Sequence, residues 1–395
     1  MKRSANRILT SHAGSLARPD DLRDMVTAME NGEPYDKAAM NRRLKSAVAQ
    51  VVQDQVKSGM DIVNDGEFGK GGFSNYARVR LSGLEQRAPE ALPQARNITG
   101  RDLKEFPEFF AMGAGGVGPP RVGAAPAPAG GANRPVFCVG PVKYIGQEAI
   151  RTDIENFKAA LQGARVEEAF MPAIAPGTIE HWLWNQHYPS DEAFLYAIAD
   201  AMHEEYKAIV DAGFILQIDD PDLPDAWQIH PEMTVPQYQR YAEIRVDAIN
   251  HALRGLPEDR VRLHTCWGSG HGPHRNDIEL RDIIQVVLKV KAQCISIEAS
   301  NPRHEQDYHV WETVKLPAGK ILMPGVVGHI TNMIEHPELV AERLLRYARL
   351  VGRENLIAGT DCGLGTRVAH PSICWAKFRA MREGADIATK QLWGR

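Results

Sequence analysis

Residues 262–277, RLHTCWGSGHGPHRND, place three histidines and one cysteine in a short run that begins apolar and ends polar. If the run begins as a β-strand, His264 and Cys266 are two positions apart and their side chains point to the same face. An imidazole and a thiolate on one face suit the chelation of one metal ion, and this pair favours zinc. A His-x-Cys pair also occurs without a metal, so these two residues alone do not define a site.

Two further ligand-type residues stand at the ends of other apolar runs. CISIE (294–298) ends on Glu298, and LIAGTD (356–361) leads directly into Cys362. Four zinc-type ligands at the ends of three predicted strands are a stronger pattern than one pair, and they are enough for a tetrahedral site. We therefore predict a zinc site with the ligands His264, Cys266, Glu298 and Cys362. For Glu298, a general base and a salt-bridge partner are the alternatives.

Other polar residues stand in equivalent places and are candidates for substrate contacts. They are Asp219 and Asp220 at and after the end of FILQID (214–219), Glu67 after DIVND (61–65), and the segment HAGS (12–15) after ILTS (8–11). Loop histidines are more often solvated than bound to a ligand, so His271 and His274 are expected to be loop residues. Cys138 and Cys294 lie inside apolar runs and are expected to be inert core thiols.

The elements that must position these residues alternate along the chain. Eight short apolar runs read as strands, at residues 8–11, 61–65, 168–175, 214–219, 261–266, 294–298, 320–326 and 356–361. Helical patterns fall between them, a polar one over 36–58 and two with end signals over 190–213 and 336–352. Repeated strand–helix units predict parallel strands, and eight of them favour an α/β fold of the (β/α)8 TIM-barrel type over a doubly wound open sheet. Active-site groups of such barrels lie at the carboxyl ends of the strands.

One region is too long for a single strand–helix unit. We predict one domain over 1–395 with an inserted excursion at 85–165, after the second strand. The run PVFCVGPVKYIG (135–146) predicts an extra strand outside the barrel. A Gly/Ala/Pro-rich tract at 111–135 cannot pack a core and predicts a loop, either a plain surface insertion or a lid over the site.

Composition excludes several functional classes. The 395 residues carry a net charge of −4 without a long basic run, which speaks against nucleic-acid binding. No window approaches the roughly 20 apolar residues of a membrane span, and the N-terminus has no apolar signal core. Five scattered cysteines, an odd number, argue against a disulfide framework. We predict a cytoplasmic protein with free or metal-bound thiols.

Three motifs resemble those of a known family. HTCWG, SIEASNP and GTDCGLGTR are similar to the zinc-binding motifs of cobalamin-independent methionine synthase. The resemblance implies the TIM barrel of the methionine synthase and uroporphyrinogen decarboxylase-like type, and a Zn²⁺ cofactor. Carried over residue by residue, it implies the same four ligands that the strand ends indicate.

The resemblance extends over nearly the whole chain and implies substrate residues. QIDDPDL (217–223) and DGEFGKGGF (65–73) resemble segments that bind the ammonium group of the amino acid substrate, here through Asp219 and Glu67. HAGSLARP (12–19) resembles the segment that binds the substrate carboxylate, here through Gly14 and Ser15. MPGVVGHITN (323–332) places His329 near a family histidine. His329 and His12 are the candidate catalytic residues for moving a proton to the leaving group.

The chain is one barrel long, so it resembles the short, single-barrel members of the superfamily, which include epoxyalkane:coenzyme M transferases. The family's Glu after the substrate-binding Asp is Asp220 here. We predict a zinc-dependent transferase that activates a small-molecule thiol for S-alkylation, with methyl transfer to homocysteine or a similar thiol as the first reading. The alternatives are a coenzyme M transferase-like or other C–S bond-forming or cleaving enzyme, for which Arg18 would bind a sulfonate, and a non-catalytic zinc- or thiol-binding protein. The partners are the thiol and an alkyl or methyl donor, and a homo-oligomer is possible.

Overall fold

The computed structural model describes residues 1–72, 75–88, 100–112, 135–365, 368 and 370–394, and within them eight strands form one sheet in which every pairing is parallel. These strands are β1 (Leu9–Thr10), β2 (Ile62–Val63), β5 (Glu168–Ile174), β7 (Ile215–Asp219), β8 (Val261–Thr265), β9 (Cys294–Ile297), β10 (Ile321–Val327) and β11 (Ile357–Thr360). Seven of them lie within predicted strand runs, and β10 overlaps the run 320–326 and ends one residue beyond it. Their spatial order is β1-β11-β10-β9-β8-β7-β5-β2.

The two end strands of this sheet come together. The amide of Asp61, beside β2, donates to the carbonyl of Thr10 in β1 over 3.1 Å. The Ser11 hydroxyl reaches the carbonyl of Ile62 at 3.4 Å. The sheet is therefore a near-closed barrel, and the predicted fold class is confirmed.

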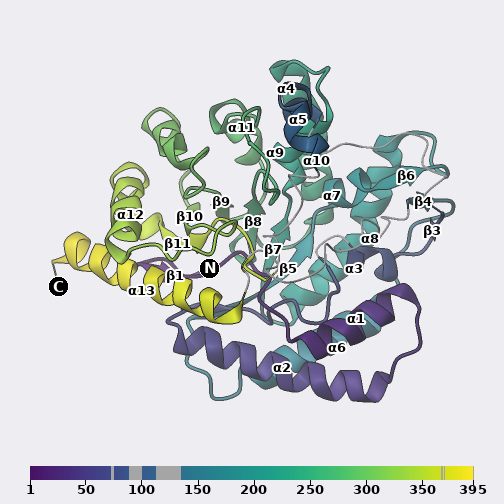
Figure 1. Cartoon of the computed structure of the whole chain (residues 1–395), viewed down its shortest axis with the longest axis horizontal. Helices are drawn as coiled ribbons and strands as arrows, with labels where there is room; N and C mark the ends of the chain where they lie inside the picture. Colours follow the sequence, from purple (N-terminus) through teal and green to yellow (C-terminus); the bar gives the residue numbers. More distant parts are fainter. Residues whose placement is uncertain (73–74, 89–99, 113–134, 366–367, 369, 395) are drawn as a thin grey trace.

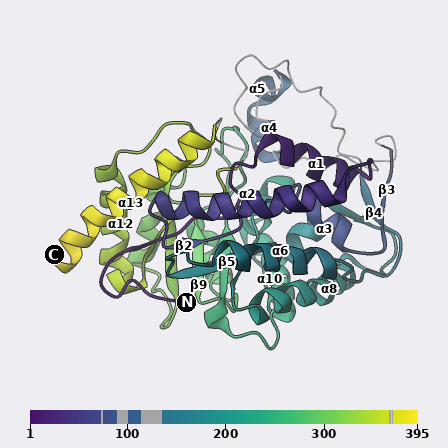
Figure 2. The same ribbon diagram turned by 90° about the horizontal axis from the view of Figure 1, so that it is seen from below.

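Helices surround the barrel strands on the outside (Figures 1 and 2). The longer ones are α1 (Asp20–Asn31), α2 (Lys37–Lys57), α6 (Gln147–Ala160), α8 (Asp191–Asp211), α10 (Val235–Ala252), α12 (Pro337–Val351) and α13 (Pro371–Trp393). The shorter ones are α3 (Asn75–Arg80), α4 (Gly100–Glu105), α5 (Pro107–Ala111), α7 (Pro176–His181), α9 (Asp222–Ile229) and α11 (Leu280–Val287), with 3-10 turns η2 (Glu258–Arg260), η3 (Glu305–Glu312) and η4 (Arg353–Asn355).

Side-chain caps explain where the predicted helices begin. The Asp36 carboxylate accepts a hydrogen bond from the amide of Ala39 at the start of α2. The Ser190 hydroxyl accepts one from the amide of Ala193 at the start of α8. Such caps satisfy amide groups that have no partner within the helix. The helices predicted at 36–58, 190–213 and 336–352 are confirmed as α2, α8 and α12.

Apolar side chains of the strands fill the barrel interior as a cluster separate from the core under the helices. It consists of Leu9, Ile62, Phe170, Ile215, Cys294, Ile321, Met323 and Ile357, which come from every barrel strand except β8. In β8 the buried Arg262 contributes instead, with its guanidinium 3.5 Å from the centroid of the Phe170 ring. Its Nε donates to Gln217 Oε1 over 2.6 Å. Because alternate residues of a strand share a face, β8 presents Arg262 and His264 to the interior.

A smaller sheet lies outside the barrel, at the edge of the molecule away from the C-terminus (Figure 1). Within the described residues it has the order β3 (Leu84–Gln86), β4 (Val136–Cys138), β6 (Leu183–Asn185). Strand β4 confirms the extra strand predicted within 135–146. Most of the predicted Gly/Ala/Pro loop, residues 113–134, lies outside the described residues. The single domain over 1–395 with an excursion at 85–165 stays a prediction. None of the helices in the described part of the chain combines the length and apolar character that a bilayer crossing requires.

Candidate metal centre and cavity

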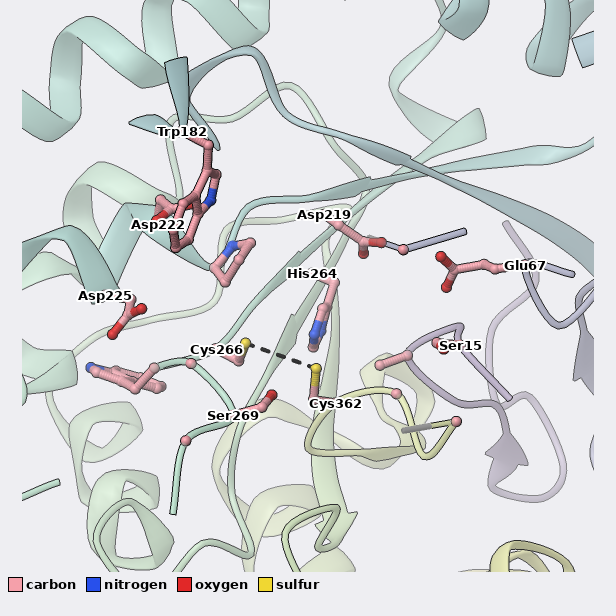
Figure 3. Close-up of a pocket in the computed structure, with 18 of the residues that line it drawn as sticks. Ser15, Glu67, Trp182, Asp219, Asp222, Asp225, His264, Cys266, Ser269 and Cys362 are labelled. Carbon is pink, nitrogen blue, oxygen red and sulfur yellow. Dashed lines mark hydrogen bonds between the residues drawn. The ribbon is translucent and has the colours of Figure 1, made fainter. Parts of the chain in front are cut away.

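Three of the four predicted metal ligands meet at the carboxyl ends of the barrel strands (Figure 3). His264 belongs to β8, Cys266 follows it, and Cys362 follows β11. One ligand atom from each lies within 4.8 Å of the others, and the two sulfurs are 4.0 Å apart. Residues 96 positions apart in the chain meet here because both strands end at the same rim of the barrel.

The hydrogen bonding of this cluster fits a soft divalent cation. His264 Nδ1 lies 3.2 Å from the Ser296 hydroxyl, whereas its buried Nε2 has no hydrogen-bond partner among the described residues. In metal sites the second ring nitrogen usually holds such a partner while the first binds the ion. Two sulfurs and an unpartnered imidazole nitrogen are a donor set that zinc prefers.

The two thiols are not equivalent. The pKa of Cys362 is held well below its ordinary value because Cys266 donates a hydrogen bond to its sulfur, an effect that outweighs burial. The charges of His329 and His264 act in the same direction. The pKa of Cys266 is raised in turn, since it is the donor and is buried. Cys362 is therefore the sulfur that first carries negative charge.

Glu298, the fourth predicted ligand, is not part of this compact group. Its Oε2 accepts a hydrogen bond from Asn301 Nδ2 over 3.3 Å, while Oε1 is buried without a partner in the described part of the chain. Burial raises the pKa of Glu298, and the charges of Asp361 and Cys362 add to the effect. It is an unsatisfied carboxyl group beside the cluster.

A cavity of 370 Å³ opens on the cluster, and three of the four predicted substrate residues line it: Ser15, Glu67 and Asp219. Gly14 does not line it but makes room for Glu67. A Cβ atom at Gly14 would lie 2.5 Å from Glu67 Oε1, and the φ of +126° also favours glycine there. The structure thus brings the predicted metal and substrate residues to one place.

Glu67 and Asp219 both resist ionisation. Burial raises the pKa of Glu67 to about 7, and the nearby charge of Asp65 contributes. Burial raises the pKa of Asp219 to about 8, with a contribution from the charge of Glu67. Gln217 Nε2 donates to Asp219 Oδ1 over 2.6 Å. Two buried carboxyl groups of this kind favour a bound cation, because a positive charge between them would lower both pKa values.

Arg18, the expected sulfonate contact, lines the cavity and binds the backbone through one nitrogen, while its buried Nε has no partner among the described residues. Its Nη2 donates to the carbonyl of Glu67 over 2.8 Å and also to the carbonyl of Lys70. The guanidinium therefore holds the loop that carries Glu67, which has a left-handed φ of 60°.

The two predicted catalytic histidines have different places. His329 is buried close to the metal cluster, and its Nε2 lies 2.9 Å from the Ser269 hydroxyl. His12 is not brought to the cavity. Its Nε2 lies 2.8 Å from Gln55 Oε1, and its ring packs against Phe170 and Phe378. Burial lowers the pKa of His12 to about 3.

The far wall of the cavity holds residues that the sequence analysis did not select. These are Trp182, Asp222, Asp225, Ser269, His274 and Asp277. Asp222 and Asp225 begin helix α9 directly after Asp220, a carboxylate-rich spacing that is visible in the sequence. His274 was expected to be a solvated loop residue, but its side chain is only 13% exposed and lines the cavity. Its partners, Asp277 and Gly270, lie three and four positions away in the same segment, but the sequence does not show that the ring is buried there.

A near-closed parallel barrel with a thiol and imidazole cluster at its carboxyl rim that could hold a metal ion is the architecture of a TIM-barrel enzyme. Residues 138–387 match the family described as the catalytic domain of cobalamin-independent synthase. The chain belongs to this cobalamin-independent methionine synthase family, and it is a methionine synthase-like methyltransferase. The resemblance and the enzyme class predicted from the sequence are confirmed.

Individual relatives match this chain over nearly their whole length. The methionine synthases of Thermococcus kodakarensis and Saccharolobus solfataricus are each 24% identical to this chain over 384 and 390 residues, which is 97% of this chain and 94% and 95% of theirs. The structure of a B12-independent methionine synthase from Shewanella sp. W3-18-1 in complex with selenomethionine has a TM-score of 0.69 at 20% identity, covering 98% of this chain and 100% of that one. A putative vitamin-B12 independent methionine synthase from Listeria monocytogenes has a TM-score of 0.63 at 19% identity, covering 97% and 99%.

Proposed function

We propose that this protein transfers a methyl group to the sulfur of homocysteine or a similar amino thiol, with zinc held by His264, Cys266 and Cys362. One observation carries the proposal: this cluster shares a single cavity with two buried carboxyl groups, Glu67 and Asp219. A thiol placed at the cluster can reach the carboxyl pair with an ammonium group. Relatives of this chain are methionine synthases, which supports the same reaction.

The protein side chains would do most of the positioning. Glu67 and Asp219 would bind the substrate ammonium, whose charge brings their raised pKa values down. Ser15, with the backbone at Gly14, would bind the carboxylate at the opposite side of the amino acid. Held at both groups, the substrate has one free arm, and that arm carries the sulfur.

Zinc, when bound, would lower the pKa of the substrate thiol and keep its sulfur nucleophilic at neutral pH. The unpartnered Oε1 of Glu298 supports this residue as a further ligand. Two thiolate ligands make the centre electron-rich, which favours attack by sulfur over activation of water. His329, which lies close enough to lower the pKa of Cys362, would hold the proton that moves to the leaving group.

A sulfonate thiol such as coenzyme M fits less well. Nη2 of Arg18 donates to two backbone carbonyls, its buried Nε has no partner among the described residues, and the carboxyl groups of Glu67 and Asp219 line the same cavity. A negative sulfonate would be repelled by Glu67 and Asp219, whereas an ammonium would be attracted. The cytoplasmic location and the homo-oligomer stay predictions. The chemical nature of the methyl donor stays open.

Two assays on the zinc-loaded protein test the proposal. Zinc-edge X-ray absorption should gain one sulfur ligand when homocysteine is added, and much less when the matched thiol 4-mercaptobutyrate, which lacks the ammonium, is added at the same concentration. Incubation with homocysteine and methyl-folate should yield methionine by mass spectrometry. Absence of a new sulfur ligand with homocysteine would overturn the proposal, and sulfur binding without methionine would reassign only the methyl donor.

A further inference from the structure

The segment Trp267–Gly270, directly after the candidate ligand Cys266, is fastened at both ends. At one end the Trp267 ring stacks on His304, with centroids 3.9 Å apart and planes 19° from parallel, and its Nε1 donates to the carbonyl of Ile278 over 2.7 Å. At the other end the carbonyl of Gly270 accepts a hydrogen bond from His274 Nε2 over 3.1 Å. Both fastenings are histidine side chains from outside the segment.

A single carboxylate holds both histidines. Asp277 Oδ2 lies 2.8 Å from His274 Nδ1 and 3.1 Å from His304 Nε2. Its other oxygen accepts a hydrogen bond from Gln228 Nε2 over 3.0 Å. The second ring nitrogen of His304 faces Asp307 Oδ2 at 2.9 Å. Asp277 therefore holds both ends of the segment Trp267–Gly270 through the two histidines.

This hydrogen-bond pattern requires both rings to be imidazolium. With Asp277 and Asp307 ionised, each of the four ring nitrogens faces an oxygen that only accepts, so each nitrogen carries a proton. Burial works against the charge of His274, but Asp277 outweighs it and raises the pKa to about 9, and Asp225 from α9 acts in the same direction. The pKa of His304 is also raised against burial, by Asp277 and Asp307. The pKa of Asp277 is lowered by the two histidines, which outweigh its burial.

The backbone gives a second, independent sign that this region is held in place. Among the described residues, Glu67 and His274 are the non-glycine residues with positive φ, at 60° and 52°. Both line the cavity. Such conformations persist where the surroundings over-determine them, and they gather at functional sites. For His274 the surroundings are Asp277 and the carbonyl of Gly270.

We propose that Asp277 is a positioning residue that, through His274 and His304, fixes the segment Trp267–Gly270 beside the metal centre. The segment begins next to Cys266 and carries the Ser269 hydroxyl to His329 Nε2. A loose segment would let both the thiol ligand and the His329 ring change place. The effect on turnover rests on the proposed function, whereas the effects on ring protonation and metal affinity do not.

The first test is spectroscopic and needs no substrate. Protein labelled with ring-¹⁵N histidine should show two imidazolium rings at pH 8, each assigned by its loss in His274→Gln or His304→Gln. Asp277→Asn, which keeps the shape and removes the charge, should turn at least one of them neutral. Glu312→Gln is the matched control, because it removes a carboxylate from the exposed His309 at 2.8 Å. Two neutral rings at pH 8 in the unaltered protein would overturn the proposal.

The second test measures the consequence for the site. Outer hydrogen-bond partners of metal sites typically contribute about 10–100-fold to metal affinity or activity. Asp277→Asn should weaken zinc binding in competition with a chelator by about 10-fold and lower kcat by about 10–100-fold, with the thiol KM within about threefold. The residues proposed to bind the ammonium and carboxylate, Glu67, Asp219 and Ser15, line the cavity but make no hydrogen bond to the Asp277 network among the described residues, which is why KM should hold. Zinc affinity and kcat both equal to those of Glu312→Gln would refute the positioning role.

A second variant keeps the test decisive if Asp277→Asn does not fold. His274→Gln releases only the Gly270 end and leaves the His304–Asp307 pair in place. It should lower zinc affinity in the same direction by a smaller factor, and an affinity equal to that of the control would also refute the role. If no methyl transfer is found with any substrate, the zinc and ¹⁵N results still decide this inference.

Discussion

The two walls of the cavity differ in how completely their polar groups are satisfied. On the thiol side, His264 Nε2 and Glu298 Oε1 lack partners among the described residues, and Glu67 and Asp219 have raised pKa values. On the other side, both nitrogens of His274 and of His304 face acceptors at 2.8–3.1 Å. Buried polar groups are normally paired, so the first wall is incomplete without a ligand, whereas the Asp277 network of the second wall is a finished support. Elsewhere in the second wall, Asp222 Oδ2 is buried without a partner among the described residues, and burial raises the pKa of Asp225.

The largest expected effect comes from removing a candidate metal ligand on the thiol side of the cavity. Cys362→Ser removes the sulfur of lowest pKa and should abolish stoichiometric zinc and lower methyl transfer by more than about 100-fold, the upper range for mere outer-shell changes. Zinc analysis and turnover measure this. Cys374→Ser, a buried thiol on helix α13, is the matched control and should keep its zinc. Stoichiometric zinc in Cys362→Ser would contradict the ligand assignment.

The hydrogen-bond network of Asp277, His274 and His304 should affect how the free energy of unfolding depends on pH. The folded-state pKa of His274, about 9, lies above its ordinary value of 6.5, so its stabilisation is full below pH 6.5 and is lost as the pH rises through 9. Between these limits, the difference in unfolding free energy between the protein and His274→Gln should shrink by up to about 3 kcal/mol.

Denaturant unfolding of the metal-free proteins at pH 6.5 and pH 9 measures this difference. The exposed His309 supplies the control variant His309→Gln, for which the difference should stay nearly constant. A constant difference for His274→Gln as well would mean that the ring is not held as an imidazolium.

A substitution of Asp219, on the thiol side of the cavity, should have a smaller effect. It should weaken substrate binding without weakening the fold. Asp219→Asn removes a charge partner of the substrate ammonium and should raise the KM for homocysteine about 30-fold, as expected for a hydrogen bond to a charged group. Because burial disfavours the ionised form of Asp219, the metal-free variant should at the same time be more stable by about 1–2 kcal/mol. A loss of stability would show that Asp219 also supports the fold.

The smallest expected effect concerns the contact between His264 and the Ser296 hydroxyl. Ser296→Ala removes the hydroxyl beside His264 Nδ1 and should weaken zinc binding by about 10-fold. Chelator competition measures it, with Ser190→Ala at the remote start of α8 as the control. An unchanged affinity would mean that the strand backbone alone orients the His264 ring.

Local sequence patterns predicted the barrel and the meeting of His264, Cys266 and Cys362 because strand periodicity determines both. His264 and Cys266 share a face of β8, and Cys362 follows a strand that ends at the same rim. The side-chain direction of Glu298 and the burial of His12 depend on packing between distant elements, which periodicity does not contain. The pairing of His304 with Asp277, 27 positions apart in the chain, is likewise a tertiary contact. His274 pairs locally with Asp277, three positions further on, but the burial of its ring depends on packing that the loop sequence does not show.

The pairing of the first and last barrel strands, β1 and β11, determines when the barrel can close during folding. Strand β1 pairs with β11, and the amide of Ala13 donates to the Thr360 hydroxyl 347 positions along the chain. Contacts this distant in sequence form slowly, and during synthesis the earlier part of the chain emerges first. We expect the barrel to close only after β11 has left the ribosome. Cys362 and Ser15 would then meet across the cavity in the last step of folding, so a partly made chain cannot assemble the metal centre early.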